Sequence, residues 1–270
     1  MNLKSFVLPI LLSIIYLSSS SQKRDEDEMK KFIKLDNLKW EEVFYDSCTT
    51  GWKKNWTLDG KKATILHSEK GMDFMAGPVR REDESHAVLW TKESFKGDIR
   101  IDYEYTKLED IQEAVTIIYI QASGSEELGF DKDISMWAEQ REVAAMNKYF
   151  RNMNTYHISY AAFNIGNEEA ESDYIRARRY MPANKKGLRG TDLKPDYFNT
   201  GLFKRGVLHK ITILKKDDDL FMYIRNDEKK MLCHWKTGDF PPVVEGRIGL
   251  RHMWTRGARY MDFRISQLKD

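Results

Sequence analysis

The chain has 270 residues, and its 44 Lys and Arg nearly balance its 42 Asp and Glu, which gives a formal net charge of +2. This balance provides no bulk positive field to attract nucleic acid, and 41% hydrophobic with 32% charged residues is typical of a folded globular chain. The two cysteines exclude a disulfide scaffold and a four-cysteine zinc site, while 12% aromatic residues favour β-structure or a stacking surface.

The N-terminal segment predicts export. Lys4 supplies a positive charge, residues 6–17 are mostly apolar, and residues 18–21 are serines that suit a cleavage site. The apolar run is shorter than the about 20 residues that a membrane-spanning helix needs, so residues 1–21 are predicted to be a cleaved signal peptide. Residues 22–40 are then a charged leader, expected to be mobile. The mature protein is predicted to be secreted or periplasmic, with no transmembrane segment and no lipoprotein cysteine.

Export changes how the two cysteines are interpreted. In an oxidising compartment Cys48 and Cys233 are able to form a disulfide. Two separate buried thiols are the alternative, because the sequence does not reveal whether their Cβ atoms approach each other.

Short strand-like segments follow one another through most of the chain. The clearest is 98–105, where Ile99, Ile101, Tyr103 and Tyr105 share one face and charged residues occupy the other. Such a period of two indicates a strand. The other predicted strands are 43–45, 63–67, 86–90, 114–120, 208–214, 220–224, 230–235, 246–252 and 259–265. Many short strands with turns at about ten-residue spacing predict an all-β fold, a two-sheet jelly-roll sandwich, forming a single domain over residues 41–270.

Two middle segments depart from this pattern. Residues 134–150 lack clean alternation, and residues 164–206 are polar and rich in Asn, Gly, Lys and Arg. We expect long, partly helical or irregular insertions on the β scaffold, where binding residues tend to collect.

Several stretches carry a family resemblance. They are FYD at 44–46 with Trp52 and Trp56, HAVLW at 86–90, HISY at 157–160, and GRIGLRHM at 246–253 running to YMDF at 260–263. The first stretch resembles the entry of many concanavalin A-like jelly rolls. The other three together resemble the YesU-like bacterial family, a group of domains of unknown function in the concanavalin A-like lectin/glucanase superfamily. The resemblance implies a two-sheet jelly roll and an association with the use of pectin- or uronic-acid-type glycans. It carries over no catalytic residue.

The chemistry of acidic glycans narrows the candidate residues. A glycosidase needs two carboxylates at a set separation. Asp102 and Glu104 share a strand face, but Arg100 shares it as well, which is typical of a solvated side. A lyase needs a cation for the uronate carboxylate together with an acid and a base, for which Arg, His and Tyr are suitable.

These residue types gather in three places along the chain. The candidates for a catalytic role are His157, Tyr160, Arg178, Arg251 and His252. The candidates for substrate binding are Trp137, Tyr119, Arg176, Trp254 and Arg256. Structural roles stay open as alternatives. The position of His157 also fits a histidine of the core or of an edge strand, and residues 176–179 also fit a solvated loop that pairs with nearby acids.

No metal ligand set and no cofactor is predicted, and a structural calcium at residues 217–219 is a weaker alternative to a solvated turn. The leading hypothesis is an exported protein that engages an acidic polysaccharide or oligosaccharide containing uronate or rhamnose, as a lyase or a hydrolase. One alternative is a non-catalytic glycan-binding module. The other is a structural or partner-binding envelope protein without a sugar site.

Overall fold

The computed structural model describes residues 8–163 and 173–269, and side chains from residue 22 onward. The chain divides into two compact units, residues 1–39 and 40–270. The first unit contains one helix, α1 (Leu8–Asp36), so the leader expected to be mobile is helical as far as Asp36. Among the described residues, no helix has both the length and the apolar character needed to cross a membrane. The signal peptide stays a prediction, and its residues 1–7 lie outside the described part.

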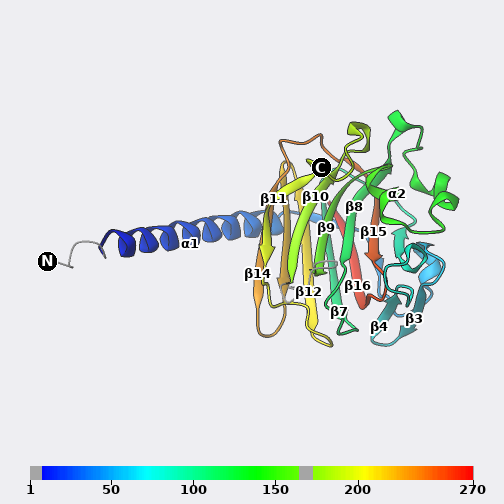
Figure 1. Cartoon of the computed structure of the whole chain (residues 1–270), viewed down its shortest axis with the longest axis horizontal. Helices are drawn as coiled ribbons and strands as arrows, with labels where there is room; N and C mark the ends of the chain where they lie inside the picture. The colour runs from blue at the N-terminus through cyan, green and yellow to red at the C-terminus, as the bar shows by residue number, and fades with distance from the viewer. Residues whose placement is uncertain (1–7, 164–172, 270) are drawn as a thin grey trace. The chain divides into compact units, whose positions relative to one another are not determined.

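The second unit is a sandwich of two antiparallel sheets (Figure 1), which confirms the predicted all-β, two-sheet fold. Sheet 1 has the order β14-β13-β12-β7-β16-β4-β3, with β1 paired to β16. Its strands are β1 (Trp40–Asp46), β3 (Thr64–Ser68), β4 (Gly71–Met75), β7 (Ile99–Lys107), β12 (Leu208–Lys216), β13 (Asp219–Arg225), β14 (Lys230–Lys236) and β16 (Gly257–Leu268).

Sheet 2 has the order β11-β10-β9-β8-β15-β5-β2, with β6 paired to β15. Its strands are β2 (Trp56–Asp59), β5 (Ala87–Thr91), β6 (Phe95–Lys96), β8 (Thr116–Gly124), β9 (Met153–Ala162), β10 (Tyr174–Tyr180), β11 (Asp192–Phe198) and β15 (Glu245–His252). Short helices join some of these strands: η1 (Trp52–Lys54), η2 (Asp83–Ser85), η3 (Glu126–Leu128), η4 (Ile134–Arg141), α2 (Met146–Phe150) and η5 (Pro182–Asn184).

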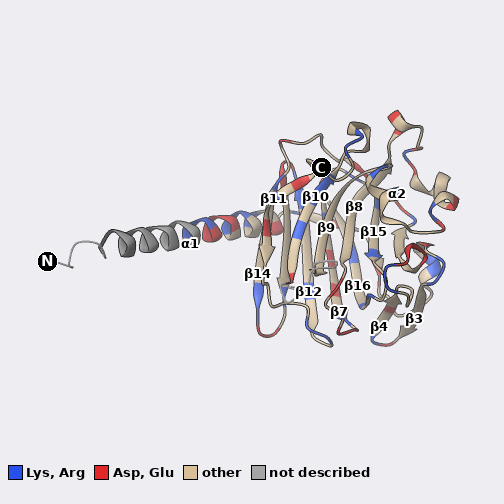
Figure 2. Cartoon of the chain, viewed as in Figure 1, with Lys and Arg blue, Asp and Glu red and all other residues tan. Residues whose placement is uncertain are grey.

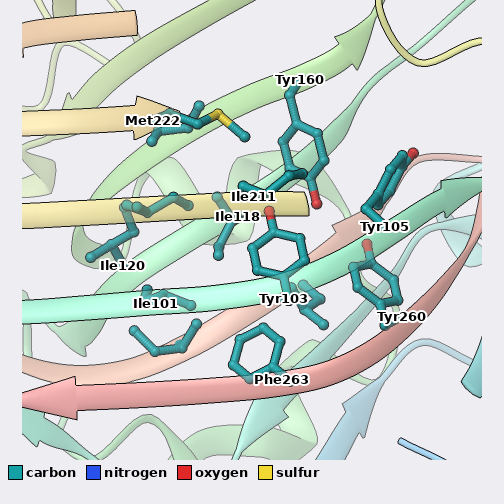
Figure 3. Packing of buried hydrophobic residues seen from close by; sticks show 14 of the residues in the cluster. Ile101, Tyr103, Tyr105, Ile118, Ile120, Tyr160, Ile211, Met222, Tyr260 and Phe263 are labelled. Carbon is teal, nitrogen blue, oxygen red and sulfur yellow. The ribbon is translucent and has the colours of Figure 1, made fainter. Parts of the chain in front are cut away.

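The main core lies between the two sheets. The alternation predicted for 98–105 is present in β7, where the side chains of Ile101, Tyr103 and Tyr105 are buried against the opposite sheet. Ile118 and Tyr160 enter this core from sheet 2 (Figure 3). Burial of a large apolar side chain contributes roughly 1.5–3 kcal/mol, so the many large side chains of this layer hold the two sheets together.

The two predicted insertions have different outcomes. Residues 126–152 do form an irregular segment with short helices between β8 and β9. The prediction for 164–206 is wrong in part, because β10 and β11 fall within it, whereas residues 164–172 lie outside the described part. The polar outward face of β10 hides its strand pattern, but Ile175 and Ala177 on the other face join the core. Polar composition alone therefore did not identify a loop.

Of the two alternatives that the sequence left open for the cysteines, the structure contains the separate buried thiols and not the disulfide. Cys48 and Cys233 are both free thiols, and each is buried in the main core. Burial, and then the charge of Asp46, raises the pKa of Cys48 far above its usual value, so this thiol stays protonated.

Residues 217 and 218 form the turn between β12 and β13, and Asp219 begins β13. The sequence left a calcium alternative open at these three residues. The Asp219 carboxylate accepts from His234 Nε2 at 2.7 Å and from Lys236 Nζ at 2.6 Å, and Asp217 accepts from Lys216 at 3.0 Å. Across residues 8–163 and 173–269, no group of three or more His, Cys, Asp and Glu side chains is placed to hold a metal ion.

Candidate functional site

The outer face of sheet 2 is the face turned away from sheet 1, and it brings several predicted site residues together. Arg178 lies opposite His157 across β10 and β9, and His157 lies opposite Tyr119 across β9 and β8. Arg176 is two residues before Arg178 on the same face, and Arg251 occupies this face of β15. Residues from four segments of the sequence are therefore neighbours on one sheet.

Much of this outer face is covered by the segment 126–152, which we call the insertion. Tyr149 of the insertion stacks on Tyr119 with ring centroids 5.7 Å apart, and Tyr119 in turn stacks on Trp90 at 5.4 Å. The guanidinium of Arg251 lies over the Tyr149 ring at 4.5 Å. The part of the face that carries β5, β8 and β15 is therefore a second packed core rather than an open groove.

A buried carboxylate anchors the insertion. Asp59 accepts hydrogen bonds from Arg141 Nε at 2.7 Å, Trp90 Nε1 at 2.7 Å and Tyr149 Oη at 3.1 Å. Arg141 also packs on the ring of Trp137, with its guanidinium 4.3 Å from the ring centroid. One carboxylate of β2 thus fixes three side chains that close the outer face.

This packing decides the position of several predicted sugar-binding residues. Tyr119 is fully buried in the stack, and Trp137 is buried with its indole Nε1 donating to the Asp131 carbonyl at 3.0 Å. Trp254 is buried against His86, with ring centroids 5.0 Å apart. None of these three rings is exposed for stacking on a sugar.

Three further predicted site residues face away from the outer face of sheet 2. Tyr160 packs between the sheets against Tyr105, with ring centroids 5.2 Å apart. His252 also points inward, and its Nε2 is 2.9 Å from the Tyr260 hydroxyl. Arg256 is buried and ion-paired with Glu109 at 3.1 Å. The structure does not bring these residues together with His157 and Arg178.

The environment of His157 makes it a weak base. Its Nδ1 is hydrogen-bonded to the Tyr180 hydroxyl, and its Nε2 is 2.6 Å from Ser159 Oγ. Burial, followed by the guanidinium groups of Arg178 and two other arginines, lowers the pKa of His157 well below its usual value. A base must accept a positive charge, and this surrounding opposes that charge. The Ser159–His157 pair therefore resembles a nucleophile and base in its geometry but not in its electrostatics.

Arg176 and Arg178 each have an acidic partner on β11. Arg178 pairs with Asp192 at 3.0 Å, and Arg176 pairs with Asp196 at 2.9 Å. The two arginine side chains remain 17% and 25% exposed respectively. Partly exposed ion pairs such as these contribute only about 0.2–1 kcal/mol, so a ligand can compete for either arginine at small cost.

A basic hollow lies where β10 ends, between the insertion and the connection from β10 to β11. Its volume is about 710 Å³. Its lining includes four cations and an aromatic ring, and the full set is Leu128, Phe150, Arg151, Pro182, Lys185, Lys186, Gly187 and Arg189. Phe150 is in edge contact with Tyr180 at 6.3 Å, which joins the hollow to the hydrogen-bonded pair of Tyr180 and His157.

The cations of this hollow have no acidic partners among the residues that the structure describes. Arg151, Lys185, Lys186 and Arg189 form no ion pair within residues 8–163 and 173–269, whereas most buried arginines of the unit do. Elsewhere basic and acidic residues are interspersed over the strands, and Figure 2 shows this mixture. The hollow therefore concentrates positive charge in a chain that is nearly neutral overall.

None of these four cations was among the predicted site residues. The adjacent Lys185 and Lys186 were a visible signal, but they follow no strand or helix period that would place them beside Arg151. Only the folded chain brings the connection after β10 against the end of α2.

Comparisons with known proteins agree with this architecture. A crystal structure of a protein of unknown function with a galectin-like fold from Bacillus subtilis is similar, with a TM-score of 0.62, 17% identity, and coverage of 85% of this chain and 98% of that chain. The exoplasmic/lumenal domain of VIP36, bound to Ca²⁺ and Man3GlcNAc, has a TM-score of 0.55 at 11% identity, covering 86% and 92% of the two chains. A legume lectin-like domain from Entamoeba histolytica has a TM-score of 0.53 at 8% identity, covering 85% and 99%.

These identities are low, so the likeness establishes the lectin-like fold alone. No curated protein matches the chain. The finer YesU-like assignment stays a prediction, whereas a sequence family described as a domain of unknown function, DUF1961, matches residues 48–265. Because this match spans most of the sandwich, the chain belongs to the DUF1961 family.

Proposed function

We propose that this protein binds an anionic polysaccharide, and that the basic hollow at the end of β10 holds acidic groups of the sugar chain. The observation that carries the proposal is a hollow of about 710 Å³ lined by four cations that pair with no acid in the described part of the chain. Cations gathered around one hollow favour a ligand with several negative charges. A uronate-containing glycan has this chemistry.

The hollow also offers contacts that a simple anion would not use. Phe150 lines it, and the Arg151 guanidinium lies 5.9 Å from the Phe150 ring centroid. An aromatic face suits the C–H face of a sugar ring, while Arg and Lys donate charge-assisted hydrogen bonds to carboxylates. Beyond Tyr180, Arg178 and Arg176 continue the row of cations along β10, about 7 Å apart because alternate strand residues share a face.

Turnover is not part of this proposal. His157 is linked to the hollow through Tyr180 and Phe150, and it is a poor general base because burial and neighbouring guanidinium groups oppose its protonation. Asp102 and Glu104, the carboxylate pair considered for a hydrolase, are on sheet 1, where they pair with Arg100 and Lys210. The lectin-like fold and the predicted signal peptide are consistent with a binding role outside the cell.

The proposal is tested by calorimetry and affinity electrophoresis with pectic, alginate, ulvan and glycosaminoglycan polymers. The decisive variant is Lys185→Ala/Lys186→Ala, and its matched control is Lys53→Ala/Lys54→Ala. The control removes an equally exposed adjacent lysine pair from η1. We expect at least one uronate polymer to bind the wild type, with binding that weakens as salt is added. We expect the decisive variant to bind about tenfold more weakly, and the control to bind as the wild type does.

Two results would contradict the proposal. One is the absence of binding to every acidic polymer at low salt. The other is an equal loss of affinity in both lysine-pair variants, which would indicate non-specific charge attraction. Release of unsaturated products during the incubation would show instead that the protein is a lyase.

A further inference from the structure

The buried Arg251 differs from the other fully buried arginines of the sandwich. It is 0% exposed, and it forms no ion pair with any carboxylate in the described part of the chain. Arg141 and Arg256 are buried to the same degree, but they pair with Asp59 and Glu109 respectively. A guanidinium stays protonated in proteins, so Arg251 carries a buried charge without a counter-charge.

Arg251 also lacks acceptors for part of its hydrogen-bonding capacity. Its Nη2 donates to His86 Nδ1 at 2.6 Å and to the Ala144 carbonyl at 2.8 Å. Its Nε and Nη1 are buried and meet the geometry of a hydrogen bond with no group among the described residues, although the Tyr119 hydroxyl lies close enough to interact with the guanidinium. Unpaired buried donors on a charged group are strongly unfavourable, and native structures rarely contain them without an explanation.

Two more buried donors adjoin this arginine. Because His86 Nδ1 accepts from Arg251, the ring proton of neutral His86 resides on Nε2, which also has no partner in the described part of the chain. The indole Nε1 of Trp254 likewise finds no partner within residues 22–163 and 173–269, and the Trp254 ring packs on His86 with centroids 5.0 Å apart. His86 therefore links Arg251 and Trp254, and the three side chains contain four buried nitrogen donors that form no well-aligned hydrogen bond within the described residues.

The charges around the cluster indicate what would satisfy it. The ion pair of Asp59 and Arg141 is neutral as a unit, and burial keeps both His86 and Tyr149 uncharged. One positive charge on Arg251 remains. A partner with one negative charge balances it, and a small one is required because Arg251, His86 and Trp254 are all buried beneath the insertion.

From this geometry we infer that the cluster of Arg251, His86 and Trp254 binds a small monovalent inorganic anion of halide size. The site lies between β15, β5 and the insertion, and it is separate from the basic hollow proposed to bind glycan. A bound halide accepts from the free donors of Arg251 or of the His86–Trp254 pair and neutralises the buried charge. The anion thereby becomes part of the packing that holds the insertion on sheet 2.

The experiment measures thermal unfolding of the full chain at constant ionic strength while sodium chloride or bromide replaces sodium gluconate. Gluconate is too large for a site beneath the insertion. We expect the midpoint temperature of the wild type to rise with halide concentration, as it does for any ligand that binds only the native state. We expect this rise to disappear in Arg251→Met and to shrink in Trp254→Phe, which keeps the ring but removes a donor.

The matched control is Arg179→Met. Arg179 is also buried without a carboxylate partner, but its guanidinium donates to the Pro241 carbonyl, the Tyr180 carbonyl and Asn154 Oδ1. This variant should keep the halide-dependent rise. An equal response to halide and gluconate in the wild type would overturn the inference, because buried water then satisfies the donors.

A direct readout covers the case in which Arg251→Met does not fold. Crystals of the wild type grown in bromide should show an anomalous peak at hydrogen-bonding distance from Arg251 or Trp254. The absence of bromide at both residues would overturn the inference. Neither readout involves glycan, so this inference and the proposed glycan binding can fail independently.

Discussion

The anchor of the insertion gives the sharpest stability prediction, namely that Asp59→Ala is severely destabilising. The Asp59 and Arg141 side chains are 4% and 2% exposed, so the substitution leaves a buried guanidinium without its counter-charge. Removing one partner of a buried ion pair typically costs 3–5 kcal/mol, and we expect a loss of about 4 kcal/mol in the free energy of unfolding. Trp90 Nε1 and Tyr149 Oη lose their acceptor as well.

A double variant separates the charge effect from the packing effect. Asp59→Asn/Arg141→Met removes both charges but keeps a side-chain oxygen for Trp90 and Tyr149. Because a buried pair replaced as a unit is often nearly neutral for stability, we expect this variant to recover at least half of the loss. Near-ultraviolet circular dichroism in urea reports the packing of the Trp90 stack, and limited proteolysis reports release of residues 126–152.

The reasoning fails if Asp59→Ala loses less than about 1 kcal/mol, a value typical of exposed pairs. It also fails if the double variant is as unstable as the single one. Either result would mean that the Asp59 carboxylate does not anchor the insertion.

Three further predictions concern other buried groups. Burial, and then a nearby guanidinium, lowers the pKa of His86 from 6.5 to about 3. Below about pH 6.5, His86 therefore binds a proton in the unfolded chain but stays neutral in the native protein. As a result, His86 lowers the free energy of unfolding by up to about 1.4 kcal/mol for each unit that the pH falls. When the free energy of unfolding is measured by urea titration from pH 7 to 4, it should fall less steeply with decreasing pH in His86→Gln than in the wild type. An unchanged pH dependence would refute the lowered pKa of His86. Gly249→Ala should lose about 1–3 kcal/mol in the same assay, because a Cβ there would lie 2.4 Å from the Trp90 ring, and full stability would disprove this contact. Cys48 and Cys233 should react with a thiol reagent only after denaturation, and a melting temperature that falls in reductant would show that they pair after all.

Alternation in the sequence predicted much of the sandwich but not which face of each strand looks inward. Ile101 and Tyr103 identified β7 because their period of two is uninterrupted. The same alternation puts His157 and Tyr160 on opposite faces of β9, and the structure shows that Tyr160 faces the main core. The predicted catalytic residues, chosen for their chemistry, therefore included side chains on opposite faces of one sheet, which cannot form a single site.

The open part of the candidate site depends on contacts between distant loops. Arg151 follows α2, and Arg189 lies in the connection after β10, with no periodic pattern linking them. The closure of the outer face was equally unpredictable, because it rests on Asp59 of β2 binding Arg141 of the insertion, 82 residues later. Such pairings arise from the three-dimensional arrangement of the sheets, which a single sequence does not encode in its local pattern.

The most direct test of the account is an amide NMR titration of the isotope-labelled protein with a uronate oligosaccharide. If the basic hollow is the binding site, chemical shifts will change first for Phe150 and Arg151 and for residues 185–189, with smaller changes along β10. Changes confined to sheet 1, or none at saturating oligosaccharide and low salt, would contradict it.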